Sequence, residues 1–246
     1  MKSFKTALSI LTTIPASLSS APNEKTLKKS VYFFPLCGYI IALFSVISIM
    51  LISQIFEIDI MVQAIAIVTL LFLFSGGIHL DGLADSCDAM FCQTDRDNRI
   101  RILHDSRLGS FGTIGLVIIL LAKTIAIYVL LKNSNYLLIA SAVVMARLQV
   151  IFIVYYGKYF PYDKGMGKEI IGKIPIITVF VTVLYSLPCF IFSIHAIIVT
   201  VIIALIVFFI YKKCCLKLGG ISGDILGAVI ELSETLALIL LTVHII

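Results

Sequence analysis

Long apolar runs, broken only by short polar segments, dominate this sequence and restrict what it can fold into. A helix that crosses a membrane needs about 20 consecutive apolar residues, and seven runs approach that length: 32–56, 60–78, 111–131, 136–156, 174–193, 195–211 and 225–246. Hydrophobic residues make up 60% of the chain and charged residues only 13%, whereas soluble domains are about half apolar and a quarter charged. We therefore predict an all-α, polytopic integral membrane bundle of about seven transmembrane helices, forming a single domain over residues 1–246. Six or eight spans also fit, because the fifth and sixth runs are nearly continuous and residues 3–14 could form a re-entrant helix.

The positive charges predict the orientation of these helices. If the N-terminus is cytoplasmic, all but three of the 19 lysines and arginines fall in cytoplasmic segments, as the positive-inside rule requires. We therefore expect a multi-pass protein of the cytoplasmic (inner) membrane, with the C-terminus outside and the polar loops 76–110, 157–173 and 212–224 on the cytoplasmic face. The loop 157–173 could be a lid over a nucleotide or an ordinary positive-inside loop. Because the net charge of +5 comes from short separate segments, nucleic acid is not an expected partner.

The loop 76–110 contains six of the 14 acidic residues of the chain. In a helix, Asp81, Asp85 and Asp88 are spaced i, i+4 and i+7, so that their carboxylates share one face and repel one another. A divalent cation would convert this repulsion into attraction, and oxygen ligands suit Mg²⁺ or Mn²⁺. Such a cluster beside a membrane suggests transfer chemistry on a phosphate or pyrophosphate. The simpler alternative is a helix-capping aspartate followed by a solvated acidic face.

Two further polar groups flank this cluster. His79 could take part in proton transfer or contact a phosphate, although a histidine at a helix end is more often a structural hydrogen-bonding residue. In the segment His104–Gly112, Arg107 offers a planar fork for phosphate and Ser106 offers a hydroxyl donor. The alternative for this segment is an ordinary turn with a positive-inside arginine.

A glycine-rich turn, Gly219-Gly-Ile-Ser-Gly-Asp224, leads into the last apolar run. Backbone N–H groups at a helix N-terminus bind anions, so Gly220 and Gly223 are candidates for phosphate binding. The pattern matches neither a P-loop nor a dinucleotide-binding fingerprint.

Charged residues also lie within the predicted spans. Glu231 and Glu234 follow Asp224 along one stripe of the last helix, and a charge in an apolar helix requires a partner or a water-filled cavity. Lys123 and Arg147, in two other spans, are the candidate partners. These residues could belong to a functional site, or they could form buried ion pairs that fix the register of the helices.

Several of these segments resemble one known family, the cobalamin synthases (adenosylcobinamide-GDP ribazoletransferases). The resemblance rests on His79-Leu-Asp-Gly-Leu-Ala-Asp-Ser-Cys-Asp88, Asp105-Ser-Arg-Leu-Gly109 and Leu218-Gly-Gly-Ile-Ser-Gly-Asp-Ile-Leu-Gly-Ala228, and it extends to Phe34-Pro-Leu, Lys123, Gly165-Met-Gly, Ile171-Gly-Lys and Glu231-Leu-Ser-Glu234. The motifs span nearly the whole chain in the family's order. Ala89 and Ile225 depart from it, where glycine and threonine are usual, and neither change removes a carboxylate.

The resemblance implies a reaction and a set of site residues. A hydroxyl of α-ribazole, or of its 5′-phosphate, would attack the cobinamide-side phosphorus of adenosylcobinamide-GDP, releasing GMP in the presence of Mg²⁺. The lipid bilayer and other nucleotide-loop enzymes would be the partners. The resulting assignment is His79, Asp105, Arg107 and Lys123 as catalytic residues, Ser106, Gly220, Gly223, Glu231 and Glu234 as binding residues for cofactor and substrate, and Asp81, Asp85, Asp88 and Asp224 as metal ligands.

Two other classes of function compete with this one. Membrane prenyltransferases and CDP-alcohol phosphotransferases also place spaced aspartates and Mg²⁺ between helices. A prenyltransferase would need a second aspartate-rich loop, and residues 218–224 offer only Asp224. A CDP-alcohol phosphotransferase would need a longer Asp-Gly-x2-Ala-Arg pattern, whereas Asp81-Gly-Leu-Ala-Asp85 lacks the arginine and the later aspartate pair. A transporter could use the charges within the spans as an ion pathway. It would predict paired broken helices and an internal repeat, which the sequence does not show.

Overall fold

Helices make up nearly all of the regular structure in the computed structural model, which describes residues 1–17, 20–161, 165–191 and 195–243. These ranges contain no strand, only an isolated bridge between Tyr159 and Ile221, so the predicted all-α class is confirmed. The helices are α1 (Lys2–Leu11), α2 (Glu24–Ser30), η1 (Val31–Phe33), α3 (Phe34–Ile55), α4 (Ile60–Ser75), α5 (Ile78–Phe91), α6 (Arg96–Leu103), α7 (Ser110–Lys132), α8 (Tyr136–Tyr156), η2 (Met166–Glu169), α9 (Ile176–Ser186), α10 (Pro188–Ile191), α11 (His195–Leu218) and α12 (Gly223–Leu241).

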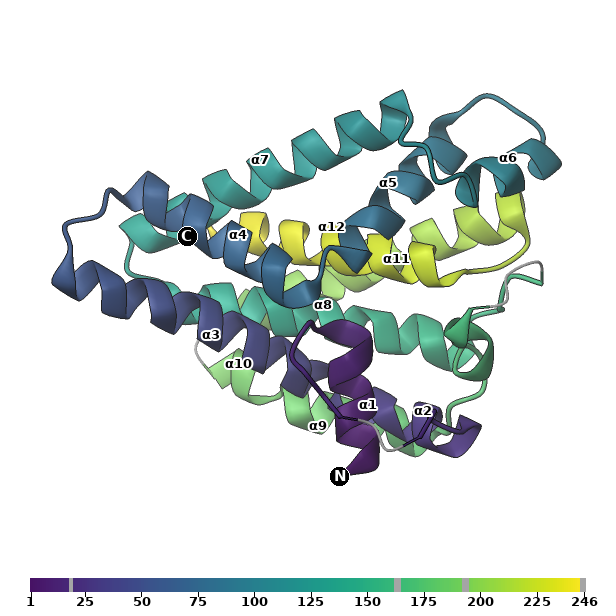
Figure 1. Ribbon diagram of the computed structural model, residues 1–246, viewed down its shortest axis with the longest axis horizontal. Helices are drawn as coiled ribbons and strands as arrows, with labels where there is room; N and C mark the ends of the chain where they lie inside the picture. Colours follow the sequence, from purple (N-terminus) through teal and green to yellow (C-terminus); the bar gives the residue numbers. More distant parts are fainter. Residues whose placement is uncertain (18–19, 162–164, 192–194, 244–246) are drawn as a thin grey trace.

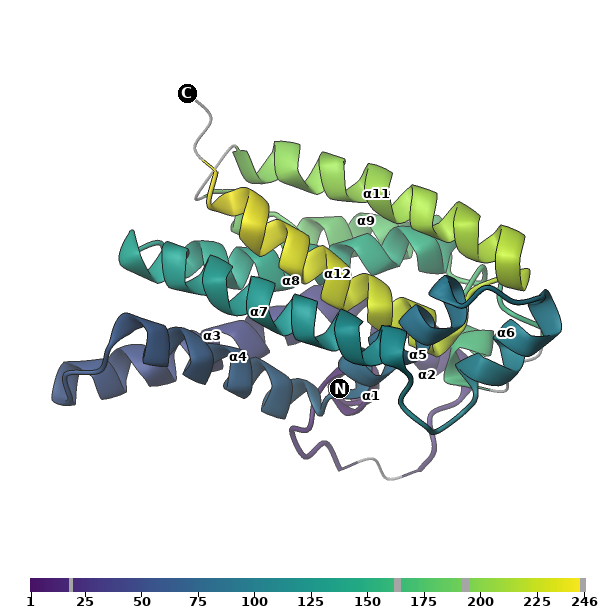
Figure 2. The ribbon, with the colours of Figure 1, turned by 90° about the horizontal axis from the view of Figure 1, so that it is seen from above.

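The centre of the bundle is formed by α8 and α12. Every residue of α8 from Ile139 to Ile151 is buried, and α12 packs against α5, α7, α8 and α11. Figure 2 shows α12 running between α7 and α11, with α8 behind it. Because α12 is covered on several sides, its acidic residues must find their partners inside the bundle.

A sharp bend separates α4 from α5. Gly76 and Gly77 follow each other with φ of 70° and 69°, a left-handed conformation that glycine adopts without steric cost. The axes of α4 and α5 consequently differ in direction by 91°. The predicted span 60–78 therefore ends at Ser75, and the acidic segment forms a separate helix.

The prediction of seven membrane spans is not confirmed. Among the residues that the structure describes, four helical segments are long and apolar enough to cross a membrane, namely 24–55, 110–132, 136–156 and 195–218, or five if the bent pair α4 and α5 counts as one span. In the predicted span 174–193 the helix α9 is short, and the sequence of α12 contains three acidic residues. The ends of two predicted spans (192–193 and 244–246) and residues 162–164 of the predicted loop lie outside the described ranges.

The connections between the helices gather at two ends of the bundle. The α3–α4 and α7–α8 turns lie at one end in Figure 1, whereas the α5–α6 segment, the end of α8 and the α11–α12 turn lie at the other. At this second end, the Phe160 N–H donates to the Ile221 carbonyl at 3.0 Å, and the Ile221 N–H donates to the Lys158 carbonyl at 2.9 Å. These bonds join the two glycine-containing loops that follow α8 and α11. The three loops expected to carry the active site therefore share one end.

Candidate active site

The acidic helix α5 touches the start of α12 through backbone atoms. A Cβ added at Gly82 would lie 2.6 Å from the Asp224 carbonyl oxygen and 2.8 Å from its Cα, closer than any side chain allows. One turn deeper, a Cβ on Gly227 would lie 3.1 Å from the Cα of His79. Glycines on both helices thus permit an approach that brings Asp224, from the last helix, to the aspartates of α5.

Asp81, Asp85 and Asp88 lie on one helix, α5, and Asp224 of α12 lies near them. Asp81 is exposed and Asp85 is half-buried. Asp81, Asp224 and Asp88 each lie close enough to repel the charge of Asp85. Within the ranges that the structure describes, no three histidine, cysteine, aspartate or glutamate side chains are grouped closely enough to hold one metal ion. The metal site therefore stays a prediction, although its carboxylates are neighbours.

Asp88 differs from the other aspartates of α5 in what its oxygens contact. It is buried, and its two oxygens accept the backbone N–H groups of Gly109 at 2.8 Å and Gly112 at 2.9 Å. These N–H groups belong to the start of α7, whose first turn has no intrahelical partner for them. Asp88 thus anchors the start of α7 on α5, a task that its spacing alone did not predict.

The segment that connects α6 to α7 places Arg107 on the surface. Its guanidinium forms an ion pair with Asp105 at 2.7 Å, and 87% of its side chain is exposed. The pKa of Asp105 is lowered to about 2 by hydrogen bonds from the Arg107 side chain and then from its backbone N–H. Ser106 is also exposed. Each of these three residues is accessible to a ligand. Their predicted roles in phosphate binding and catalysis are therefore possible in this geometry and stay predictions.

The glycines of the α11–α12 turn have different surroundings. A Cβ on Gly220 would lie 2.8 Å from the Lys158 carbonyl oxygen and from the Phe160 nitrogen, so this glycine allows the two loops to pack together. A Cβ on Gly223 would meet nothing within 4 Å. Ser222 caps α12 by accepting the Ile225 N–H at 3.3 Å. Of the two predicted binding glycines, only Gly223 borders open space.

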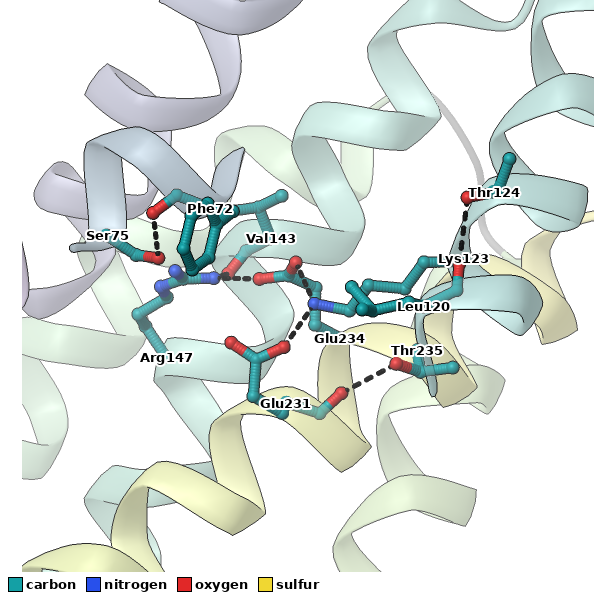
Figure 3. A network of polar contacts seen from close by, with 10 residues as sticks. All are labelled: Phe72, Ser75, Leu120, Lys123, Thr124, Val143, Arg147, Glu231, Glu234 and Thr235. Carbon is teal, nitrogen blue, oxygen red and sulfur yellow. Dashed lines mark hydrogen bonds and ion pairs between the residues drawn. The ribbon is translucent and has the colours of Figure 1, made fainter. Parts of the chain in front are cut away.

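The charges within the spans form a buried network, drawn in Figure 3. The Lys123 ammonium is paired with Glu231 and, at 2.7 Å, with Glu234. Glu234 is also paired with Arg147, whose guanidinium donates to the Val143 carbonyl at 2.9 Å. The predicted partnership of these four residues is confirmed.

This network does not provide a substrate site. The four charged side chains are at most 6% exposed, and the adjoining cavity has a volume of about 10 Å³, room for about one water molecule. Lys123, Glu231 and Glu234 therefore contact one another rather than the surface where a pyrophosphate would bind. Their predicted contact with substrate is unsupported by this geometry, because the network uses their charges internally.

Two pockets flank the acidic face. The α4–α7 groove has a volume of about 550 Å³ and an apolar lining, with Asp81 as its charged residue. The α1–α12 pocket has a volume of about 260 Å³, lies among α1, α5, η2, α8 and α12, and is bordered by His79 and Asp224. Most lining residues are apolar, including Leu116 in the groove and Leu27 in the pocket. Sequence analysis missed them because apolar residues in a membrane protein carry no functional signal.

Comparisons with known proteins agree on one family. The family model described as cobalamin-5-phosphate synthase matches residues 3–242. The chain is 33% identical to the adenosylcobinamide-GDP ribazoletransferase of Clostridioides difficile (strain 630), over 97% of this chain and 96% of the relative. It is 34% identical to the protein of that name from Thermodesulfovibrio yellowstonii, over 96% and 94%, and 32% identical to that from Klebsiella pneumoniae (strain 342), over 98% and 99%. No solved structure matches. The chain therefore belongs to the cobalamin-5-phosphate synthase family.

Proposed function

We propose that this protein joins adenosylcobinamide-GDP to α-ribazole, or to α-ribazole 5′-phosphate. A hydroxyl oxygen of the acceptor forms a bond to the cobinamide-side phosphorus, and the bond from that phosphorus to the bridging oxygen breaks. GMP leaves with the bridging oxygen, and the hydroxyl proton passes to a base on the protein. The products are GMP and adenosylcobalamin or its 5′-phosphate. The full-length similarity to ribazoletransferases supports this assignment.

The observation that carries the proposal is the meeting of Asp81, Asp85 and Asp224 between two pockets. Transfer between a large donor and a separate acceptor needs two binding regions with the reactive groups between them. The α4–α7 groove, which is lined by Asp81, and the α1–α12 pocket, which is lined by Asp224, provide two such regions beside the carboxylates. His79 and Asp224, which border the pocket, are the candidates to take the proton from the acceptor hydroxyl.

We also propose that the acidic face binds Mg²⁺. The donor set fits, because carboxylate oxygens are the ligands that Mg²⁺ prefers and because Asp85 is repelled by its acidic neighbours in this structure. Asp81, Asp85 and Asp224 would hold the ion after their side chains turn toward one another, since they are not grouped closely enough in this structure, whereas the oxygens of Asp88 already accept the N–H groups of Gly109 and Gly112. When bound, the ion would neutralise negative charge on the pyrophosphate. Arg107 is exposed and would contribute positive charge from the neighbouring segment.

The proposal includes a cellular location and partners. We place the protein in the cytoplasmic (inner) membrane with the acidic face toward the cytoplasm, since the basic residues gather in the loops at that end of the bundle. Association with other nucleotide-loop enzymes is an additional expectation, which co-purification from membranes would test.

The competing functions receive less support. The matched family and relatives are ribazoletransferases rather than prenyltransferases or CDP-alcohol phosphotransferases. A transporter would need a pathway along the charges within the spans, but the cavity beside them holds about one water molecule.

The test is an assay of GMP release by the purified, detergent-solubilised protein. With adenosylcobinamide-GDP, α-ribazole and Mg²⁺ present, we expect GMP to form in an acceptor-dependent manner, and EDTA to abolish its formation. Asp85→Asn should remove most of the activity, whereas Asp97→Asn, at an exposed position of α6, should retain it. If the protein is correctly folded and forms no GMP, the transferase assignment is refuted. Full activity of Asp85→Asn would refute the metal site alone.

A further inference from the structure

The α1–α12 pocket combines apolar walls with a histidine and an aspartate from two helices that pack together. Its apolar lining comes from α1, α2, α3, α8 and α12 and from the residue after η2, namely Leu11, Leu27, Phe34, Val150, Ile230 and Ile170. The polar side is formed by His79 of α5 and Asp224 of α12. A pocket of this composition suits a flat apolar ligand that carries hydroxyl groups at one end.

His79 provides independent evidence for a ligand. Only 4% of the residue is exposed, and its Nδ1 has no hydrogen-bond partner within the described part of the chain. Burying a polar atom without a partner is unfavourable, so such atoms in folded proteins usually contact a bound molecule or water. His79 also borders the pocket, so a turn of its ring toward the pocket would let a ligand hydroxyl complete the hydrogen bonding of this buried atom.

Size and position then distinguish between the two substrates. A volume of about 260 Å³ is close to the lower limit of drug-sized binding pockets, and it suits a nucleoside rather than a corrinoid joined to GDP. Asp224 borders the pocket and also belongs to the carboxylate cluster around Asp85. A nucleoside in this pocket would therefore present its hydroxyl groups beside the acidic face.

We propose that the α1–α12 pocket binds the acceptor, α-ribazole, with its two-ring base against the apolar walls and its ribose toward His79 and Asp224. This inference rests on the proposed function. It assigns the α4–α7 groove, which contains Asp81 on the opposite side of the cluster, to the donor. The acceptor and the donor thus approach the carboxylates from different sides.

Gly223 offers a way to fill the pocket without disturbing the fold. It lines the pocket, a Cβ at this position would meet nothing within 4 Å, and its φ lies outside the left-handed region. Gly223→Leu should therefore fold and place its side chain where the acceptor binds. We expect the KM for α-ribazole to rise about tenfold or more, as expected for steric obstruction of an apolar pocket, and to rise by more than the KM for adenosylcobinamide-GDP.

Two further variants make the test specific. Ser9→Phe adds bulk at an exposed residue that lines the same pocket, and it should also raise the α-ribazole KM. Leu116→Phe places an aromatic ring in the α4–α7 groove and should leave the α-ribazole KM unchanged. The inference is overturned if both pocket variants keep the wild-type α-ribazole KM, or if they raise the donor KM instead.

Binding of α-ribazole alone separates this inference from the proposed function. Equilibrium dialysis of α-ribazole against the detergent-solubilised protein needs no donor and no turnover. We expect saturable binding by the wild-type protein that is weakened about tenfold or more in Gly223→Leu. If no GMP is formed but this binding pattern is observed, the pocket assignment stands and the reaction is wrong. If GMP is formed and α-ribazole binding is equal in both proteins, the reaction stands and the pocket assignment is wrong.

Discussion

The three aspartates of α5 have the same spacing along one helix face but different surroundings. Asp81 is exposed and borders the α4–α7 groove, and Asp85 is half-buried among acidic neighbours. Asp88 is buried and accepts two backbone N–H groups from α7. A carboxylate can accept both bonds, whereas an amide has only one acceptor oxygen. This difference separates a structural role for Asp88 from the proposed ligand role of Asp81.

Asp88→Asn should therefore destabilise the protein, whereas Asp81→Asn should not. We expect a loss of about 1–3 kcal/mol in the free energy of unfolding for Asp88→Asn, because one buried N–H loses its acceptor. For Asp81→Asn we expect little change or a gain of a few tenths of a kcal/mol, because like-charge repulsion on the helix is relieved, together with loss of most GMP release. Thermal unfolding in detergent and the GMP assay measure the two properties. An Asp88→Asn protein of wild-type stability would contradict the anchoring role.

The sequence predicted the positions of individual residues better than their contacts. The i, i+4, i+7 spacing correctly placed Asp81, Asp85 and Asp88 on one helix. It did not predict that Asp88 would bond to Gly109 and Gly112, because that contact depends on how α7 approaches α5. The same limitation applies to Gly220, whose glycine pattern suggested anion binding, while the structure shows close packing of two loops.

At the scale of elements, the buried charges connect three helices. Lys123 of α7, Arg147 of α8 and both glutamates of α12 form one network. Each cation has an anionic partner, so the network carries no net formal charge. Desolvated charges of this kind contribute little to the free energy of folding as a set, but the loss of one member leaves another charge buried without its partner. The network therefore fixes which helix faces meet more than it adds to stability.

Glu234→Gln should destabilise the protein strongly, since it removes the anion that both Lys123 and Arg147 contact. We expect a loss of about 3–5 kcal/mol in the free energy of unfolding. Combining it with Arg147→Met should cost less than the two single changes added together, because the double variant leaves no unpaired guanidinium. Thr235→Val, which removes only a hydroxyl bond to the Glu231 carbonyl, is the matched control and should cost about 1 kcal/mol or less. Strict additivity in the double variant would show that Glu234 and Arg147 are not coupled.

The partners in this network were predictable from the sequence, because charges within apolar runs must be paired and only Lys123 and Arg147 were available. The boundary of α4 was not. The run 60–78 is continuously apolar as far as Ser75, and two consecutive glycines are compatible with a helix, a kink or a turn. Only the positive φ of Gly76 and Gly77 shows that the acidic segment turns away through 91°. This bend is what brings α5 against α12.

At the scale of the whole molecule, the number of membrane crossings and the position of the site depend on different physical features. Hydropathy predicts which segments are apolar, but it does not distinguish a span from a short or buried helix, so seven spans were expected where four or five qualify within the described part of the chain. The three polar loops lie at one end of the bundle (Figure 1), and their role as active-site loops stays a prediction. The charge distribution, rather than the span count, supplied that part of the prediction.

The orientation of the bundle can be measured by thiol labelling at its two ends. In a variant with serine at Cys87, Cys92 and Cys215, the three cysteines that are not fully buried, a new cysteine would be placed at Gln93 or at Asn133. Both positions are exposed, and they lie in the α5–α6 connection and at the α7–α8 turn, at opposite ends of the bundle. Since the lysines and arginines concentrate in the loops at the end that contains Gln93, the positive-inside rule keeps this end in the cytoplasm.

A membrane-impermeant maleimide should therefore modify Asn133→Cys in intact cells and Gln93→Cys only after permeabilisation. The reverse pattern would place the acidic face outside, away from cytoplasmic nucleotides, and would contradict the proposed reaction at its natural location. Labelling of both positions from one side would show that the two ends of the bundle do not lie on opposite sides of the membrane.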